Sequence, residues 1–393
     1  MVPKIELPKG FKASGINSGV RRYRPDFGLI LSDMPCAAAG TFTRNSLKAA
    51  PVLYCAERLP ASDIRAIVVN SGQANAATGL EGIEDNAKLV ARTAETLGVT
   101  ADQVLVASTG VIGVRLPLDI LLPALVPAVR GFGDSINNFG LAIMTTDLVP
   151  KVITREVKLS GGTVRLSGAA KGSGMIHPNM GTMLGFVLTD LKTDAAWLDR
   201  ATKSIVDETF NMISVDGETS TNDSVLVLAN GASNVAATSE ADRAAFHDAL
   251  RDVMRDLAMA IARDGEGASK LITVNVKGGP TIELAREAAR LITTSPLIKS
   301  AVHGEDPNWG RILARLGQAG VPTEAFAKLR VQLQSTVVFD EGKPQKFDRA
   351  AAREQLHDEN VLIAVDLRSG PFEATAWGCD LTKRYVEINT EYS

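Results

Sequence analysis

The sequence predicts a mixed α/β protein in which short buried strands alternate with amphipathic helices. Apolar, β-branched runs such as 65–69 and 104–107 alternate with longer segments of helical periodicity such as 83–97. Apolar residues make up 45% of the chain and charged residues 22%, as is ordinary for a globular protein. At 393 residues the chain exceeds what one compact core usually holds, so we expect two or more subdomains.

Turn and cap residues mark the ends of several predicted elements. The helix 83–97 stops at Gly98, because glycine readily adopts the left-handed conformation that closes a helix. The glycine-containing turn 160–162 separates two strand-like runs, 152–159 and 163–169, and predicts a hairpin. The later elements, in chain order, are strand 183–188, helix 195–210, strand 223–228, helix 240–263, strand 271–276, helix 282–292 and strands near 329–339, 361–367 and 372–376.

Charge and residue spacing argue against nucleic-acid, membrane and metal functions. The formal net charge is −3, with acids and bases mixed along the chain, so no surface suited to nucleic acid or lipid is indicated. The longest apolar stretch, 116–129, is interrupted by Asp119 and by prolines, and the N-terminus lacks the apolar core of a signal peptide. We therefore expect a cytoplasmic protein. The three cysteines and four histidines show no metal-ligand spacing, so no metal site is expected.

An irregular segment, 170–180, leads into the predicted strand 183–188 and places Thr182 at the entrance of that strand. A hydroxyl here could attack the carbonyl of Gly181, since glycine leaves that peptide group accessible and tolerates unusual backbone angles. Cleavage would give Thr182 a free α-amine, whose reference pKa near 8 suits a general base for the adjacent hydroxyl. On these residues alone, a structural Gly-Thr pair is the more common interpretation, with Lys171 as a solvated surface residue.

The run from Lys171 to Phe186, KGSGMIHPNMGTMLGF, resembles the self-cleavage segment of the ArgJ family, the bifunctional ornithine/glutamate acetyltransferases. Gly181 stands where that family usually has alanine. Further runs resemble family motifs in the same order along nearly the whole chain: TFTRN (41–45), VNSGQANA (69–76), STGVIG (108–113), MTTD (144–147), SVDG (214–217), STND (220–223), DGEG (264–267), DPNWGR (306–311) and YVEIN (385–389).

The resemblance implies a fold and an assembly. The implied fold is an Ntn-like layered α/β sandwich of the DmpA/ArgJ kind, with a second C-terminal α/β lobe at roughly 280–393. Cleavage between Gly181 and Thr182 would give an α chain of residues 1–181 and a β chain of residues 182–393. The two chains would interlace in one globule and assemble as an α2β2 heterotetramer.

The resemblance also implies a reaction and its residues. An acetyl group would pass from N-acetyl-L-ornithine to L-glutamate in arginine biosynthesis through an acetyl ester of the nucleophile Thr182, with no metal or other cofactor. Acetyl-CoA is a second candidate donor. Thr109 and Gly110 would form the oxyanion hole. A cation and an anion suit zwitterionic substrates, and the implied substrate-binding residues are Thr145, Lys171, Thr182, Glu266, Asn389 and Ser393.

Several alternatives remain open at the level of sequence. An aminopeptidase or amidase of the DmpA type would use Thr182 but resolve the acyl-enzyme with water. A non-catalytic protein that binds amino acids and an acetyltransferase of a secondary-metabolite pathway are the others. His177 could be named as a base, but in a His-Pro loop we expect a structural role. Asp216, Asn222 and Asp223 are expected to be turn and cap residues.

Overall fold

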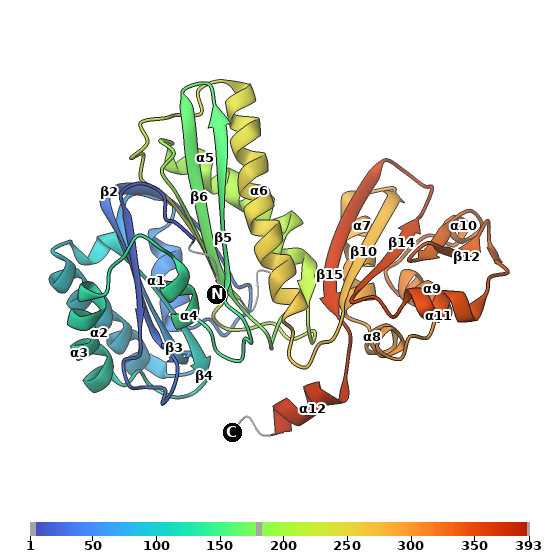
Figure 1. Ribbon diagram of the computed structural model, residues 1–393, viewed down its shortest axis with the longest axis horizontal. Helices are drawn as coiled ribbons and strands as arrows, with labels where there is room; N and C mark the ends of the chain where they lie inside the picture. The colour runs from blue at the N-terminus through green and yellow to red at the C-terminus, as the bar shows by residue number, and fades with distance from the viewer. Residues whose placement is uncertain (1–4, 178–182, 391–393) are drawn as a thin grey trace. The chain divides into compact units, whose positions relative to one another are not determined.

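The computed structural model describes residues 5–177 and 183–390, which form two compact units. The first unit contains residues 5–172, 183–211 and 218–257, and the second contains 173–177, 212–217 and 258–390. Each unit has its own sheet and helices (Figure 1). The mixed α/β class and the second C-terminal lobe are confirmed. The expected division at residues 181 and 182 falls outside the described residues and stays a prediction.

The sheet of the first unit has eight strands within the described residues, in the order β4-β3-β2-β9-β7-β6-β5, with β1 paired to β2. Strand β2 changes partners along its length, because its first half pairs with β1 and β3 whereas the part from Ala37 pairs with β9. The register of β2 against β3 shifts between Leu31 and Cys36, an irregularity that lets a strand bend. The strands are β1 (Phe11–Ile16), β2 (Phe27–Phe42), β3 (Ala61–Gln73), β4 (Val104–Val111), β5 (Lys151–Leu159), β6 (Gly162–Lys171), β7 (Leu184–Thr189) and β9 (Ser224–Ala229).

Helices flank the strands of the first unit, with α2 and α3 beyond β3 and β4, and α6 beside β5 and β6 (Figure 1), whereas α5 packs on β2. Phe186 of β7 meets Phe139 of α4 edge to face, at 5.1 Å between ring centroids. Gly168 of β6 lies against Leu257 and Val253 of α6. This layered packing is what buries the apolar runs of the sequence. The helices are α1 (Ala50–Arg58), α2 (Gly79–Leu97), α3 (Leu118–Arg130), α4 (Asn137–Ala142), α5 (Ala195–Glu208) and α6 (Glu240–Arg263).

The second unit contains a seven-stranded sheet within the described residues, in the order β13-β12-β11-β14-β10-β15-β8. Helix α7 packs on β10 and β15, and its buried face is built from alanines that allow close approach. The strands are β8 (Ile213–Ser214), β10 (Leu271–Gly279), β11 (Arg330–Leu333), β12 (Thr336–Asp340), β13 (Lys343–Pro344), β14 (Asn360–Asp366) and β15 (Phe372–Cys379). The helices are α7 (Ile282–Thr293), α8 (Pro296–His303), α9 (Gly310–Gln318), α10 (Thr323–Phe326), α11 (Arg349–Gln355) and α12 (Lys383–Thr390).

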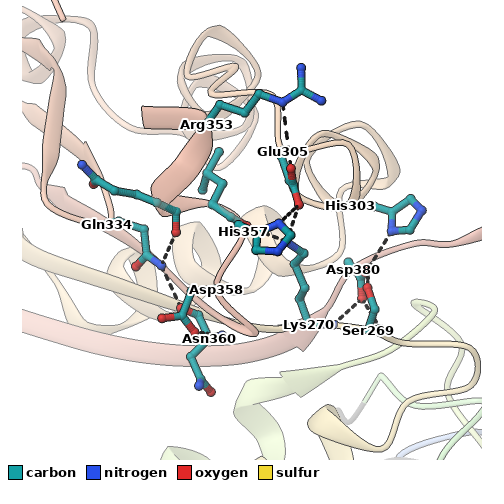
Figure 2. Close-up of polar contacts among 12 residues, drawn as sticks. Ser269, Lys270, His303, Glu305, Gln334, Arg353, His357, Asp358, Asn360 and Asp380 are labelled. Atoms are coloured by element: carbon teal, nitrogen blue, oxygen red, sulfur yellow. Dashed lines mark hydrogen bonds and ion pairs between the residues drawn. The ribbon is translucent and has the colours of Figure 1, made fainter. Parts of the chain in front are cut away.

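Two carboxylates tie the loops of the second unit to its sheet (Figure 2). Asp380, which follows β15, accepts hydrogen bonds from the backbone N of Lys270 at 2.8 Å and from His303 Nδ1 at 2.9 Å. Glu305 accepts from Lys270 Nζ at 3.2 Å and from His357 Nδ1 at 2.8 Å. Those two hydrogen bonds lower the pKa of Glu305 below its ordinary value. Lys270, just before β10, thus connects both carboxylates and fixes the entry to that strand.

The structure confirms most of the predicted elements. Helix α2 begins four residues before the predicted start at 83 and ends at Gly98, whose φ of 69° is left-handed. Strands β5 and β6 form the predicted hairpin. The region 329–339 is a hairpin of two strands, β11 and β12, and the helix predicted to reach 210 ends at Glu208. In the described part of the chain, no helix is long and apolar enough to cross a membrane.

Candidate active site

Two residues predicted for the oxyanion hole lie at the carboxyl end of β4. Thr109 and Gly110 pair in parallel with Ser71 and Gly72 of β3. Gly110 has a φ of 129°, and a Cβ atom placed on it would lie 2.3 Å from the carbonyl oxygen of Gly72. Glycine is therefore required here by both backbone conformation and space. The position presents a hydroxyl and a backbone N–H side by side.

Lys171, the last residue of β6, reaches the same place from a strand far away in the sheet order. Its buried side chain donates a hydrogen bond from Nζ to Thr109 Oγ1 at 3.3 Å. Asn222 adds a second link, because its Nδ2 donates to the carbonyl oxygens of Ser108 at 2.8 Å and Ala74 at 2.6 Å. The partner change along β2 accounts for this meeting of distant strands. Two of the residues predicted from the sequence are thus brought into direct contact.

Asp147 positions the residues around Lys171, a role that sequence reasoning did not assign. Its Oδ1 accepts hydrogen bonds from Lys151 Nζ at 2.7 Å and from the backbone N of Gly172 at 2.7 Å. Its Oδ2 accepts from the backbone N of Thr145 at 2.9 Å. Burial alone would raise the pKa of Asp147, but the cations Lys171 and Lys151 outweigh it and lower that pKa to about 2. One ionised carboxylate therefore fixes two predicted substrate-binding segments.

A small pocket lies between these groups. It has a volume of about 20 Å³ and is lined by Thr109, Lys171, Met183, Leu184, Ser220, Asn222 and Asp223. Met183 directly follows the predicted nucleophile in the sequence. Thr182 itself and Gly181 lie outside the described residues, so their roles stay predictions. Met183, the first described residue after them, lines the pocket together with Thr109.

Two predicted substrate-binding residues meet in the second unit. Asn389 of α12 donates from Nδ2 to Glu266 Oε2 at 2.9 Å, and the backbone N of Glu266 donates to the carbonyl oxygen of Ser173 at 2.9 Å. Glu266 is 8% exposed. Burial of a carboxylate with an amide partner suits a site for a cationic group. Ser393, the third residue predicted for this part of the site, lies outside the described residues.

We predict that Gly174→Ala weakens substrate binding while the fold is retained. A Cβ atom on Gly174 would lie 2.4 Å from the Glu266 carboxyl group, so this flexible side chain has to move and leave Asn389. A displaced Glu266 would also lose its charge-assisted hydrogen bond to the substrate amine, and a loss of about 1.5–3 kcal/mol corresponds to a rise in KM for N-acetyl-L-ornithine of roughly 10-fold or more. Steady-state kinetics measure it. Gly133→Ala is the matched control, because a Cβ there meets nothing within 4 Å; equal KM values for both variants would contradict the prediction.

His177, in the second unit, is held as a neutral ring between two partners. Its Nδ1 lies 3.3 Å from Ser214 Oγ and its Nε2 lies 3.1 Å from Arg290. Burial and the Arg290 charge lower the pKa of His177 to about 4. Asp216 accepts hydrogen bonds from the backbone N atoms of Met175 and Ile176, as expected of a turn residue. These contacts agree with a structural role for this segment.

Other candidate chemistries find no support in the described residues. Burial raises the pKa values of Cys36 and Cys55 to about 12, so these thiols are protonated and unreactive at neutral pH. No group of three or more potential metal ligands occurs among the residues that the structure describes. Asp223, expected to be a turn and cap residue, is buried in the pocket beside Lys171, and neither of its oxygens makes a hydrogen bond of ordinary geometry.

Together, the layered fold and the strand-end cluster of hydroxyl, N–H and cation define a mixed α/β protein with a site suited to acyl chemistry. The chain belongs to the ArgJ family, whose model matches residues 12–393. The arginine biosynthesis bifunctional protein ArgJ of Symbiobacterium thermophilum is 47% identical over 99% of this chain and 98% of its own length. The protein of the same name from Caldanaerobacter subterraneus is 46% identical over 99% and 98%.

A solved structure supports the fold independently. The crystal structure of arginine biosynthesis bifunctional protein argJ from Bacillus halodurans superimposes with a TM-score of 0.51 at 43% sequence identity. The match covers 53% of this chain and 99% of the solved chain. The family assignment inferred from the motifs is therefore confirmed, whereas the individual roles of the site residues remain to be tested.

Proposed function

We propose that the chain is an acetyltransferase of arginine biosynthesis that moves the acetyl group of N-acetyl-L-ornithine to L-glutamate. Full-length similarity to the curated ArgJ proteins supports this assignment. The observation that carries it is the contact of Lys171 with Thr109 beside Gly110, in a pocket that Met183 also lines. Met183 directly follows the predicted nucleophile Thr182 in the sequence, which supports a role for Thr109 and Gly110 in stabilising the oxyanion.

The first half-reaction transfers the acetyl group to the enzyme. The Thr182 oxygen attacks the acetyl carbonyl carbon as its proton passes to the α-amine that cleavage has exposed, and the carbonyl oxygen becomes an oxyanion. The Thr109 hydroxyl and the Gly110 N–H donate to this oxyanion. Because Lys171 Nζ already donates to Thr109 Oγ1, the hydroxyl proton of Thr109 is directed elsewhere and is available for the oxyanion. The ammonium then protonates the departing ornithine nitrogen.

The second half-reaction restores the enzyme. The amine of glutamate attacks the acetyl ester, its proton returns to the Thr182 oxygen, and N-acetylglutamate leaves. Lys171 suits a substrate carboxylate and Glu266 suits a substrate amine, with Thr145, Asn389 and Ser393 as further contacts. Neither step calls for a metal or a prosthetic group. We also propose acetyl-CoA as a second donor, an α2β2 assembly of the cleaved chains, and a cytoplasmic location.

Intact mass and N-terminal sequencing of the purified protein test the proposal. Cleavage before Thr182 is expected to give chains of about 19 and 22 kDa, by the proportion of residues in a 41.6 kDa precursor, the larger beginning Thr-Met-Leu-Gly. Incubation with N-acetylornithine and glutamate should then yield ornithine and N-acetylglutamate in equal amounts. Release of acetate alone would favour the hydrolase alternative, and an uncut chain without transfer would favour a non-catalytic binding protein.

A further inference from the structure

Asp223 occupies the position beside the entrance of β7. It directly precedes β9, and the parallel register of β7 with β9 begins at Leu184 and Ser224. The backbone N of Ser224 donates to the carbonyl oxygen of Met183 at 3.1 Å, so Asp223, the residue before Ser224, lies close to Met183. The side chain of Asp223 is 1% exposed. The fold thus places a carboxyl group where the predicted nucleophile joins the strand.

The Asp223 carboxyl has few partners for so deep a burial. Neither of its oxygens makes a hydrogen bond of ordinary geometry, and the groups placed to donate to it are Thr43 and the backbone of Met183. Burial raises the pKa of Asp223 well above its ordinary value; Thr43, Met183 and the charge of Lys171 oppose that shift without offsetting it. Burial of a carboxyl group with so little hydrogen bonding is normally unfavourable. Such a group in a native site calls for a functional explanation.

The pocket that Asp223 lines is matched in size and polarity to a single amine. Its volume of about 20 Å³ exceeds the roughly 10–15 Å³ that a water-sized group requires. Asn222 cannot serve Asp223 as a donor, because its Nδ2 donates to Ala74 and Ser108. Lys171 faces the pocket and shares the carboxylate of Asp147 with Lys151. Among the described residues that line the pocket, Asp223 is the carboxyl group that can accept from an entering N–H group.

We propose that Asp223 binds a primary amine in this pocket during acetyl transfer and pairs with the ammonium that forms when the amine takes up a proton. The inference rests on the proposed function. Two amines share this chemistry: the α-amine created on Thr182 by cleavage, and the attacking amine of the amino-acid substrate. In the first case the Thr182 hydroxyl proton moves to the α-amine, the oxygen bonds to the acetyl carbon, and Asp223 stabilises the resulting ammonium. Asp223 is then a positioning residue that acts through the amine.

The Asp223→Asn variant tests the proposal, because it keeps the shape of the side chain but cannot ionise to pair with an ammonium. Acetyl-enzyme formation is measured in a single turnover with p-nitrophenyl acetate, a donor without an amine, and KM is measured for glutamate. If the amine belongs to Thr182, acylation slows by roughly 10-fold or more, and the acidic limb of its pH profile moves to lower pH because the amine has lost its counter-charge. If the amine belongs to the substrate, acylation by this donor is unchanged and KM for glutamate rises by a similar factor.

Asp190→Asn is the matched control, since Asp190 is a buried carboxylate at the opposite end of β7 that accepts from the backbone N of Arg165. Asp190→Asn should leave the acylation rate, the acidic limb of its pH profile and KM for glutamate unchanged. If Asp223→Asn does not fold or is not cleaved, Asp223→Glu is the second test. This change moves the carboxyl group by one methylene, which must still shift the acidic limb of the pH profile or KM for glutamate. Wild-type values in the variants overturn this inference alone, whereas an uncut wild-type chain without transfer activity overturns the proposed function.

Discussion

The Thr182→Ala variant is expected to remain a single chain of 41.6 kDa and to lose acetyl transfer. Without the hydroxyl, no ester can form at the Gly181 carbonyl, so the bond in front of residue 182 stays intact. The same change removes the group that would carry the acetyl ester and prevents exposure of the α-amine that would activate it. We expect kcat to fall by about 10³-fold or more, as in other enzymes that lose their nucleophile. Intact mass and a transfer assay measure the two losses.

Thr182→Ser is the control for this prediction. Serine keeps a hydroxyl at the same atom position, so cleavage and a measurable part of the transfer activity should persist. Because the change removes one hydroxyl and one methyl group, the unfolding midpoint of Thr182→Ala should stay close to that of the wild type. Full-speed transfer by uncut Thr182→Ala protein would show that another group carries the acetyl ester.

Local chemistry made much of the fold predictable. The helix before Gly98 and the hairpin at 160–162 were predicted correctly, because a left-handed cap and a glycine turn are encoded by the residues that adopt them. Strand β2 was not predicted. It contains the run Cys36 to Gly40, CAAAG, whose small residues have little strand preference of their own. Pairing with β3 and β9 determines its conformation, and this information is not local.

The sequence likewise predicted only some of the residues of the candidate site. Thr109, Lys171, Glu266 and Asn389 lie in motifs that resemble the family, and the structure brings them together within each unit as two contacting pairs. The functions of Asp147 and Asp223 depend on what surrounds a carboxylate once the chain has folded. Both aspartates also end runs that resemble the family, MTTD and STND, but nothing in those runs shows that Asp147 accepts three hydrogen bonds whereas Asp223 accepts none of ordinary geometry. Only the folded structure shows how deeply Asp147 and Asp223 are buried and which groups contact them.

The Asp147→Asn variant is expected to unfold at markedly lower denaturant concentration and to transfer acetyl groups slowly. The side chains of Asp147 and Lys151 are almost fully buried, at 0% and 1% exposure, so removal of the negative charge takes this carboxylate away from a buried cation. Breaking a buried pair in this way costs about 3–5 kcal/mol. The asparagine amide also turns a donor toward the N–H groups of Gly172 or Thr145, which displaces both segments beside Lys171. Denaturant midpoints and single-turnover acylation rates report the two effects.

The free energy of unfolding should also depend on pH in a direction that the pKa of Asp147 determines. The pKa of Asp147 lies at about 2 in the folded protein against 3.8 as its ordinary value, so its ionised form stabilises the fold above pH 3.8 and that contribution is lost as the pH falls toward 2. The asparagine variant lacks this acid-dependent loss. Asp33→Asn is the matched control, because the Asp33 pair with Lys12 is half exposed and contributes about 0–1 kcal/mol. If the two variants had equal midpoints, Asp147 would not be the anchor on which Thr145 and Lys171 depend.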